Sequence, residues 1–388
     1  MPVKRLLNLA LTVIFLLAAA TPALAADSAL DALDSRLQKL EDATGIKLGG
    51  ALRVNYGLQD WSAASRDKSG DFAFDLFRLN LDGEVADILL SAEYRFYPEY
   101  DFDTIHHGWI GYNFSDDLQG QIGIQQVPFG IQPYASHNFW FSGAYYLGFE
   151  DDYDMGVKFL YTPGPLDVAV AFYKNAELGN SSDKERYSID LITEGVNANE
   201  ESNQGNLRLA YTLKHSDSCS TEFGWSGEYG QVYNTETSDM GDHWASAVHL
   251  VGNYGNLNVQ LEYAAYDYNL ENPAGVDDRL IHVGAFAAAW DAPAKASIGI
   301  FNAAYTFPLD WGPLDSIQVY SDNTVIEPDE SSFGTAWQNV VGAMVAAGPL
   351  YTYIDVISGE NMIFLNGNPT TPDNERNTLI NINFGYYF

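Results

Sequence analysis

Apolar and polar residues alternate along most of the chain beyond residue 46, most strictly in the last eleven residues. Side chains of a β-strand point to opposite faces in turn, so this segment has two distinct faces. One face is apolar with an aromatic end, which predicts a strand with lipid outside and water inside. An edge strand of a soluble sandwich, the alternative, leaves the terminal aromatic residue unexplained. The apolar face holds Thr378, Ile380, Ile382, Phe384, Tyr386 and Phe388.

Sixteen segments carry the alternation, which predicts an all-β fold, a 16-stranded antiparallel transmembrane β-barrel. Phe72 and Phe74 are out of register with Phe77 and Leu79, which predicts a β-bulge in the second strand. The segments are Ile46–Gln59, Phe77–Leu81, Ile88–Phe96, Ile105–Phe114, Gln121–Val127, Asp154–Tyr161, Leu166–Lys174, Asn206–Leu213, Thr221–Gln231, Trp244–Asn253, Leu257–Tyr268, Ala296–Tyr305, Leu314–Asp322, Trp337–Ala347, Leu350–Ser358 and the terminal strand.

A seventeenth apolar stretch, Leu280–Trp290, competes for inclusion as a strand. Counting it as a crossing would give an odd number of strands and would move the short turn at Gly348 to the outer side. We therefore assign Asn269–Lys295 to one long external loop; the pattern does not tell whether part of this loop folds inward.

The N-terminal residues predict export. Lys4 and Arg5 precede an apolar run, and Ala23-Leu24-Ala25 has the small-x-small pattern of a cleavage site, so residues 1–25 are predicted to be a signal peptide. Residues 26–45 are predicted to form a short periplasmic coiled-coil or helical segment, because leucines recur there with spacings of three and four. A short helix against the barrel, or no order at all, is the alternative. Residues 46–388 are predicted to be the barrel.

Composition narrows the function classes. The chain has 54 aromatic residues (25 Tyr, 21 Phe and 8 Trp) and a net charge of −33, which becomes −35 once Lys4 and Arg5 are removed. Many aromatic residues suit the interfacial girdles of a barrel. The negative charge makes nucleic acid an unlikely partner by repulsion. The single cysteine, Cys219, excludes a fold held by internal disulfides.

Two local motifs carry a family resemblance. Val127-Pro128-Phe129-Gly130 ends the fifth segment, and Asp154-Met155-Gly156-Val157-Lys158 opens the sixth. With the leader, the leucine repeat and the sixteen segments, the chain resembles the phosphate-selective porin O and P family. The resemblance implies a homotrimer of barrels in the outer membrane of a Gram-negative bacterium, with the third outer loop folded into each pore.

The charges that face water decide what a pore passes. With the apolar faces toward lipid, six basic residues are predicted to line the pore: Lys47, Arg53, Arg78, Arg95, Lys158 and Arg208. The third loop has no lysine or arginine, and its predicted acidic constriction residues are Glu150, Asp151, Asp152 and Asp154. A basic wall facing an acidic loop sets up a transverse field; ordinary lumenal salt bridges are the alternative. We expect a passive channel for ions and small hydrophilic solutes, cation-preferring or weakly selective.

Other functions stay open. A phosphate- or anion-selective porin follows from the family, and a carbohydrate channel would use the aromatic loop residues Phe139, Trp140, Phe141, Tyr145 and Tyr146. The alternative is that these rings pin the loop to the barrel wall or fill the trimer interface. An outer-membrane phospholipase or an adhesive barrel is less favoured, since no motif pairs a serine with His106, which is expected to face outward. No enzyme activity and no cofactor are predicted. The expected partners are outer-membrane lipid and lipopolysaccharide, and the barrel assembly machinery, which would recognise Phe384, Tyr386 and Phe388.

Overall fold

The computed structural model describes residues 35–36, 39, 41 and 44–388. The predicted signal peptide lies outside the described residues, as does most of the predicted coiled-coil segment. The described residues contain no helix that is both long enough and apolar enough to cross a membrane.

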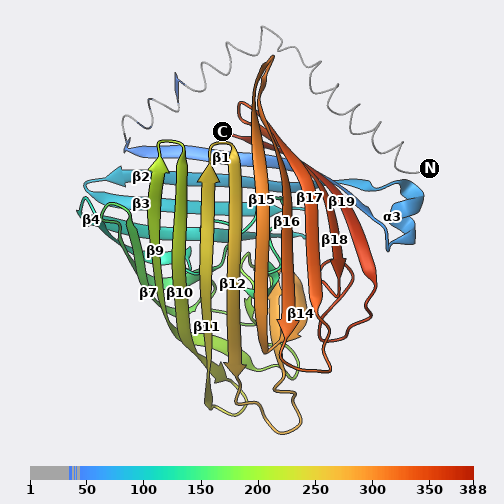
Figure 1. Ribbon diagram of the computed structural model, residues 1–388. Coiled ribbons are helices and arrows are strands. Elements are labelled where there is room, and N and C mark those ends of the chain that lie inside the picture. The colour runs from blue at the N-terminus through green and yellow to red at the C-terminus, as the bar shows by residue number, and fades with distance from the viewer. Residues whose placement is uncertain (1–34, 37–38, 40, 42–43) are drawn as a thin grey trace.

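Sixteen strands of the described chain form one closed antiparallel barrel (Figure 1). The predicted architecture is confirmed, and each predicted segment corresponds to one barrel strand. The strands are β1 (Ile46–Gln59), β2 (Asp71–Val85), β3 (Ile88–Tyr97), β4 (Phe102–Ser115), β5 (Leu118–Gln126), β6 (Tyr153–Tyr161), β7 (Leu166–Ala176), β9 (Asn199–Ser216), β10 (Cys219–Asn234), β11 (Met240–Tyr254), β12 (Leu257–Asn269), β15 (Lys295–Trp311), β16 (Leu314–Pro328), β17 (Ala336–Ala347), β18 (Leu350–Glu360) and β19 (Arg376–Tyr387).

The terminal strand closes the barrel. β19 pairs with β18 on one side and with β1 on the other, in the register Leu52↔Tyr386. Phe388 continues this pairing, because its backbone nitrogen donates to Gly50 O at 3.1 Å and its carbonyl accepts from Gly50 N at 2.8 Å. Asn381 and Asn383 are fully buried inside, whereas Tyr386 and Phe388 are exposed outside, as the alternation predicts.

The outer face of the barrel is apolar. Large side chains such as Phe172, Tyr263 and Val341 are about half exposed or more, although each sits in the middle of a paired strand. Water would not stabilise so extensive an apolar surface around a closed barrel, whereas lipid would. This face is therefore the membrane-contacting surface.

Turns and loops segregate to opposite ends. Short turns join β6 to β7, β11 to β12 and β17 to β18, and all lie at one end of the barrel. The longer connections lie at the other end. They include the third loop, L3 (residues 127–152), with the 3-10 helix η1 (Tyr145–Leu147), and the fourth loop, L4 (residues 177–198), with β8 (Asp190–Leu191). The first loop carries the short helix α3 (Ala63–Lys68), which projects at the edge of the molecule in Figure 1.

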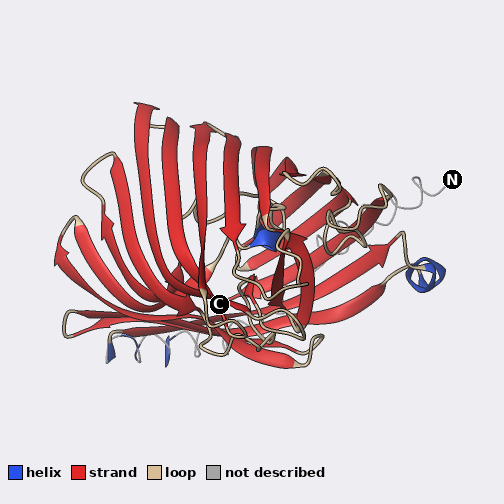
Figure 2. Ribbon diagram, turned by 90° about the horizontal axis from the view of Figure 1, so that it is seen from below, coloured by secondary structure: helices blue, strands red, loops and turns tan. Residues whose placement is uncertain are grey.

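The stretch at 280–290 is an inward-folded loop and not a barrel strand. In the sixth loop, L6 (residues 270–294), β13 (Leu280–Ala285) and β14 (Ala288–Pro293) form a hairpin that pairs with β8 of L4 in a separate three-stranded sheet. Phe286 at the hairpin tip packs against Tyr97 on the inner wall, with ring centroids 5.2 Å apart. Figure 2 shows the loops gathered within the ring of strands.

The predicted bulge in the second strand is also confirmed. Arg53 and Val54 of β1 pair with Leu76 and Phe74 of β2, so Asp75 is the extra residue. The bulge lets Phe74 keep its outward position while Asp75 faces the lumen.

Candidate pore constriction

L3 lies along one side of the inner wall, where hydrogen bonds fix it strand by strand. Asp322 of β16 accepts from the backbone nitrogens of His137 and Asn138 at 2.7 and 2.9 Å. Glu262 of β12 accepts from Ile131 N at 2.7 Å. The wall residues bonded to L3 include Arg208 (β9), Ser226 (β10), Asn258, Gln260 and Glu262 (β12), Asn302 (β15), Asp322 and Thr324 (β16), Gln338 (β17) and Asp355 (β18).

Hydrogen bonds within L3 also stabilise the loop, and Glu150 accepts them. This buried carboxylate accepts from Ala135 N at 2.9 Å, Ser136 Oγ at 2.9 Å and Ser142 N at 2.8 Å. Burial raises the pKa of Glu150 to about 7, although these hydrogen bonds oppose the shift. Glu150 therefore holds the two halves of L3 together, and its side chain does not reach the lumenal cavity.

Across the lumen from L3, three arginines stand on neighbouring strands. Arg53 is on β1, Arg78 on β2 and Arg95 on β3, and all three line one cavity of about 440 Å³. This is the basic wall that the strand parity predicts. We call Arg53, Arg78 and Arg95 the arginine wall.

Carboxylates and rings orient each guanidinium of the arginine wall. Arg53 Nε lies 2.8 Å from Asp75 Oδ2, on the bulge of β2. Glu93 of β3 pairs with Arg78 at 3.2 Å and with Arg95. Arginine stacks well on aromatic faces. Arg53 lies over Phe139 at 5.0 Å, Arg78 over Tyr387 at 5.3 Å and Arg95 over Tyr187 at 4.4 Å.

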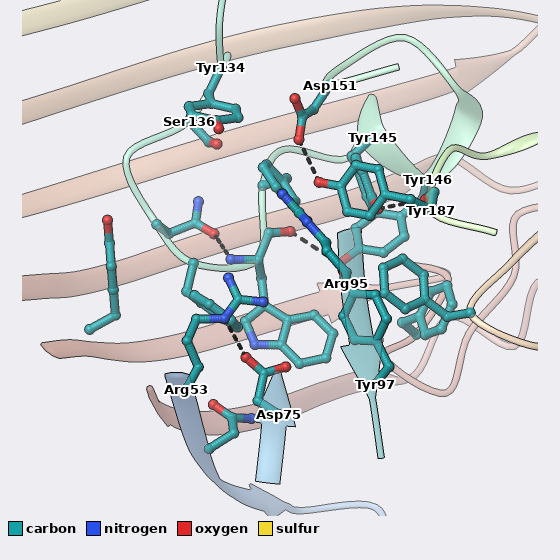
Figure 3. Close-up of a pocket in the computed structure, with 18 of the residues that line it drawn as sticks. Arg53, Asp75, Arg95, Tyr97, Tyr134, Ser136, Tyr145, Tyr146, Asp151 and Tyr187 are labelled. Carbon is teal, nitrogen blue, oxygen red and sulfur yellow. Dashed lines mark hydrogen bonds and ion pairs between the residues drawn. The ribbon is translucent and has the colours of Figure 1, made fainter. Parts of the chain in front are cut away.

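Aromatic rings form much of the rest of the cavity (Figure 3). The five loop residues singled out in the sequence, Phe139, Trp140, Phe141, Tyr145 and Tyr146, all line it. They also pack on one another, since Phe141 stacks on Tyr145 at 4.5 Å and Tyr146 donates to Trp140 O at 3.1 Å. These rings therefore both line the cavity and brace the loop.

The predicted acidic constriction residues do not lie together at the constriction, which corrects the expectation from the sequence. Only Asp151 lines the cavity, where it accepts from Tyr187 of L4 and, at 3.1 Å, from Tyr153. Burial raises the pKa of Asp151 to about 6. Asp152 and Asp154 lie instead beside Asp190 of L4, outside the cavity lining. The reason is that L3 turns back into β6 at this point, so successive side chains point to different sides of the loop.

Three of the six predicted pore-lining basic residues do not line the cavity. Lys47 shares the inward parity of Arg53 but lies six residues, about 20 Å, along β1, and it pairs with Glu41 at 3.4 Å. Lys158 is buried under L3 and donates to Gln126 O at 2.7 Å.

Arg208 also lies beneath L3. Its Nε donates to Gly130 O at 2.9 Å, and another of its nitrogens donates to Glu222 at 2.9 Å. Lys158 and Arg208 therefore position the loop or the wall, because L3 covers their parts of the lumen.

The expectation for His106 also changes. Its ring is buried and packs on Tyr153 and Tyr187 at 4.2 and 4.3 Å, so it faces inward. The register of β3 with β4 shifts at this residue, and that bulge reverses the direction that the alternation predicts.

Other cavity residues were not singled out in the sequence. Asp75 could have been found from the predicted bulge, since an extra residue at a bulge redirects a side chain. Glu93 does not line the cavity but pairs with Arg78 and Arg95, and its inward parity could have been predicted from the alternation that places Arg95. Tyr187 of L4 and Phe286 of L6 reach the cavity through loop packing, for which the alternation gives no signal.

Comparison with known proteins supports the fold. No protein-family model matches the chain, and no curated protein matches it significantly. Among solved structures, Salmonella typhi OmpF in complex with daunomycin matches with a TM-score of 0.59 and 12% identity, over 90% of this chain and 99% of that one. The trimer form of the outer-membrane protein OmpT of Vibrio cholerae matches with a TM-score of 0.55 and 14% identity, over 88% of this chain and 99% of that one. An anion-selective porin from Comamonas acidovorans matches with a TM-score of 0.55 and 11% identity, over 88% of this chain and 99% of that one.

The chain has the fold of an outer-membrane porin. The three structures are matched over almost their whole length, so the likeness covers the complete barrel and not a shared hairpin. At these identities the likeness describes architecture alone, and the phosphate-selective family is not identified by it.

Proposed function

We propose that the chain forms a water-filled diffusion channel of the outer membrane, with its narrowest part between L3 and the arginine wall. The observation that carries this proposal is the placement of L3, which is bonded to the wall from β9 to β18 and leaves the lumen open toward β1, β2 and β3. A cavity of about 440 Å³ suits small hydrophilic solutes.

For ions, we propose weak selectivity. The three guanidinium groups of the arginine wall are offset by Asp75, Glu93 and Asp151, so the fixed charges at the constriction nearly balance. Of the two expectations from the sequence, weak selectivity is favoured over cation preference, because Asp151 is the one L3 carboxylate that lines the cavity. The transverse field is weaker than an acidic loop would give, because Asp75 and Glu93 stand on the arginine wall itself and Asp151 is the one L3 carboxylate that lines the cavity opposite it.

Anion passage, including phosphate, is the second candidate. Within the described residues, no hydrogen bond reaches either terminal nitrogen of Arg53, and these donors line the cavity. Guanidinium groups bind carboxylate and phosphate oxygens well. The resemblance to the phosphate-selective family supports this candidate.

The reversal potential of the purified protein in a planar bilayer under a potassium chloride gradient tests these proposals. We expect a small reversal potential for the wild type. The triple variant Arg53→Gln, Arg78→Gln, Arg95→Gln should shift it toward cation preference, because Asp75, Glu93 and Asp151 lose their partners. An unchanged potential would contradict the placement of the constriction. Block by added phosphate would favour the second candidate, and block by neutral sugars would favour the carbohydrate alternative.

We further propose that the mature chain, cleaved near Ala26, assembles as a homotrimer, with the segment before the barrel on the periplasmic side. The trimer form of Vibrio cholerae OmpT has the same architecture and supports this proposal. Cross-linking of the detergent-solubilised protein tests it.

A further inference from the structure

A second cluster of side chains lies away from the arginine wall, where L3 returns to β6. We propose that Asp152, Asp154 and Asp190 bind one divalent cation of the oxygen-preferring kind, such as Ca²⁺, and that this cation ties L3 and L4 to the barrel. Asp152 and Asp154 come from one continuous stretch, the end of L3 and the start of β6, and Asp190 comes from β8 of L4. This proposal does not rest on the conduction properties proposed above.

The spacing of the three carboxylates fits one coordination sphere. One oxygen from each residue lies within 4.8 Å of the others. Calcium binds oxygen at about 2.3–2.6 Å, so ligands on opposite sides of one ion are about 5 Å apart. The three oxygens therefore have the separation that a single central ion requires.

Asp154 supplies an independent observation. Its side chain is 2% exposed, Oδ1 has no hydrogen-bond partner, and no described residue donates to the other oxygen. A buried carboxylate without a donor is costly unless a cation compensates it. Since this side chain is directed at Asp152 and Asp190, a cation between the three would remove the deficit.

A small cavity lies beside the cluster and is lined by two of the three carboxylates, Asp152 and Asp190, but not by Asp154. Its volume is about 10 Å³, close to the minimum for one water molecule. Gln204 lines it as well, is 6% exposed, and offers a carbonyl oxygen that no described residue bonds. A neutral amide oxygen in this position is a further ligand type that calcium accepts. The acidic residues lining the cavity are Asp152, Asp190, Glu201 and Glu228.

The balance of charges around the cavity also favours a bound cation. Six carboxyl groups gather here: Asp152, Asp154, Glu177, Asp190, Glu201 and Glu228. Among the described residues, the one arginine or lysine paired with them is Arg186, at 3.1 Å from Asp190 and 3.6 Å from Glu177. His243 approaches Glu228 only to 3.9 Å. One guanidinium leaves Asp152 and Asp154 without a counter-charge, which a divalent cation would supply.

Calorimetric titration of the chelator-treated, full-length protein in detergent with CaCl₂ tests the proposal, together with thermal unfolding at matched ionic strength. The variants are Asp154→Asn and Asp152→Asn, which keep side-chain shape. Glu236→Gln, an exposed acidic residue of the loop after β10, is the matched control. A difference in migration between unheated and heated samples in gel electrophoresis shows that each variant is folded.

We expect saturable binding of one Ca²⁺ per chain and a higher unfolding temperature with Ca²⁺ than with the same ionic strength of KCl. Both effects should be lost in Asp154→Asn and Asp152→Asn and kept in Glu236→Gln. Without calcium, Asp154→Asn should unfold at a higher temperature than the wild type, because the buried unpaired charge is gone. Equal stabilisation by KCl, equal binding by folded Asp154→Asn, or the absence of saturable binding would overturn the proposal.

Discussion

Asp75 is the bulged residue of β2, and it is the carboxylate that offsets Arg53 at the constriction. Replacing it in Asp75→Asn would keep the side-chain volume but leave the guanidinium without a counter-charge. We expect the reversal potential to shift toward anion preference, opposite in sign to the shift from loss of the arginines. The measurement is the potassium chloride gradient experiment.

The matched control for this prediction is Asp116→Asn. Asp116 is an exposed residue of the short turn between β4 and β5, at the end of the barrel opposite to the long loops. Its removal changes the net charge of the protein by the same amount. An equal shift in both variants would mean that the whole-barrel charge, and not the Arg53–Asp75 pair, sets the potential.

Glu150 was expected to act on ions at the constriction, but in the structure it stabilises L3. Neutralising the L3 carboxylates would have been expected from the sequence to shift ion preference toward anions. Because Glu150 faces the interior of L3, Glu150→Gln should leave the reversal potential unchanged. It should lower the free energy of unfolding by roughly 1 kcal/mol, since an amide cannot accept from Ser136, Ala135 and Ser142 together. Thermal unfolding checks the second effect, and a selectivity shift without loss of stability would contradict both.

At the scale of elements, L3 is positioned mainly by β16. Asp322 accepts four hydrogen bonds from His137 and Asn138, two from backbone and two from side-chain nitrogens. Asp322→Ala would leave these donors buried and unpaired, so the middle of L3 should detach from the wall. We expect larger current fluctuations and an altered single-channel conductance in planar bilayers.

The control for this element is Val319→Ala, on the same strand. Val319 is exposed on the outer face and has no bond to L3. A change in conductance in Val319→Ala as large as that in Asp322→Ala would show that general weakening of β16 is responsible. Fluctuations restricted to Asp322→Ala would assign the effect to the loop.

The strands could be predicted from the sequence because their signal is local. Two-residue alternation is visible within each segment, and the bulge at Asp75 appears as a break in that alternation. Arg53, Arg78 and Arg95 were found by the same rule, since parity alone directs them inward. The same rule also predicted that Lys158 and Arg208 line the pore. It gives the direction of a side chain, but not whether L3 covers that part of the wall.

The path of L3 could not be predicted, because long-range contacts determine it. Ile131 is bonded to a residue 131 positions away, and Phe139 to one 216 positions away. Loop composition shows that Asp151 and Asp152 are neighbours, but not that the loop directs one to the arginine wall and the other to L4. The direction in which a residue of L3 points depends on contacts with strands that come together only when the barrel closes.

At the scale of the whole molecule, closure depends on one seam between the first and last strands. β1 and β19 pair over Ala51–Gln59, and Phe388 extends the seam by two backbone bonds to Gly50. The ring of Phe388 lies close to Gly50, where an added Cβ would come within 2.7 Å of it. A glycine at position 50 therefore leaves room for the terminal ring on the barrel surface.

Removing Phe388 separates the roles of its backbone and its ring. Deletion of Phe388 takes away both the two bonds to Gly50 and an exposed aromatic side chain, whereas Phe388→Ala removes the ring alone. If the ring serves as an assembly signal, both variants should lower the amount of folded barrel in the outer membrane, measured as the heat-modifiable band in gel electrophoresis. If the seam bonds dominate, the deletion alone should do so. Phe307→Ala, an exposed outer aromatic of β15, is the control, and an equal loss there would mean that any missing surface ring impairs assembly.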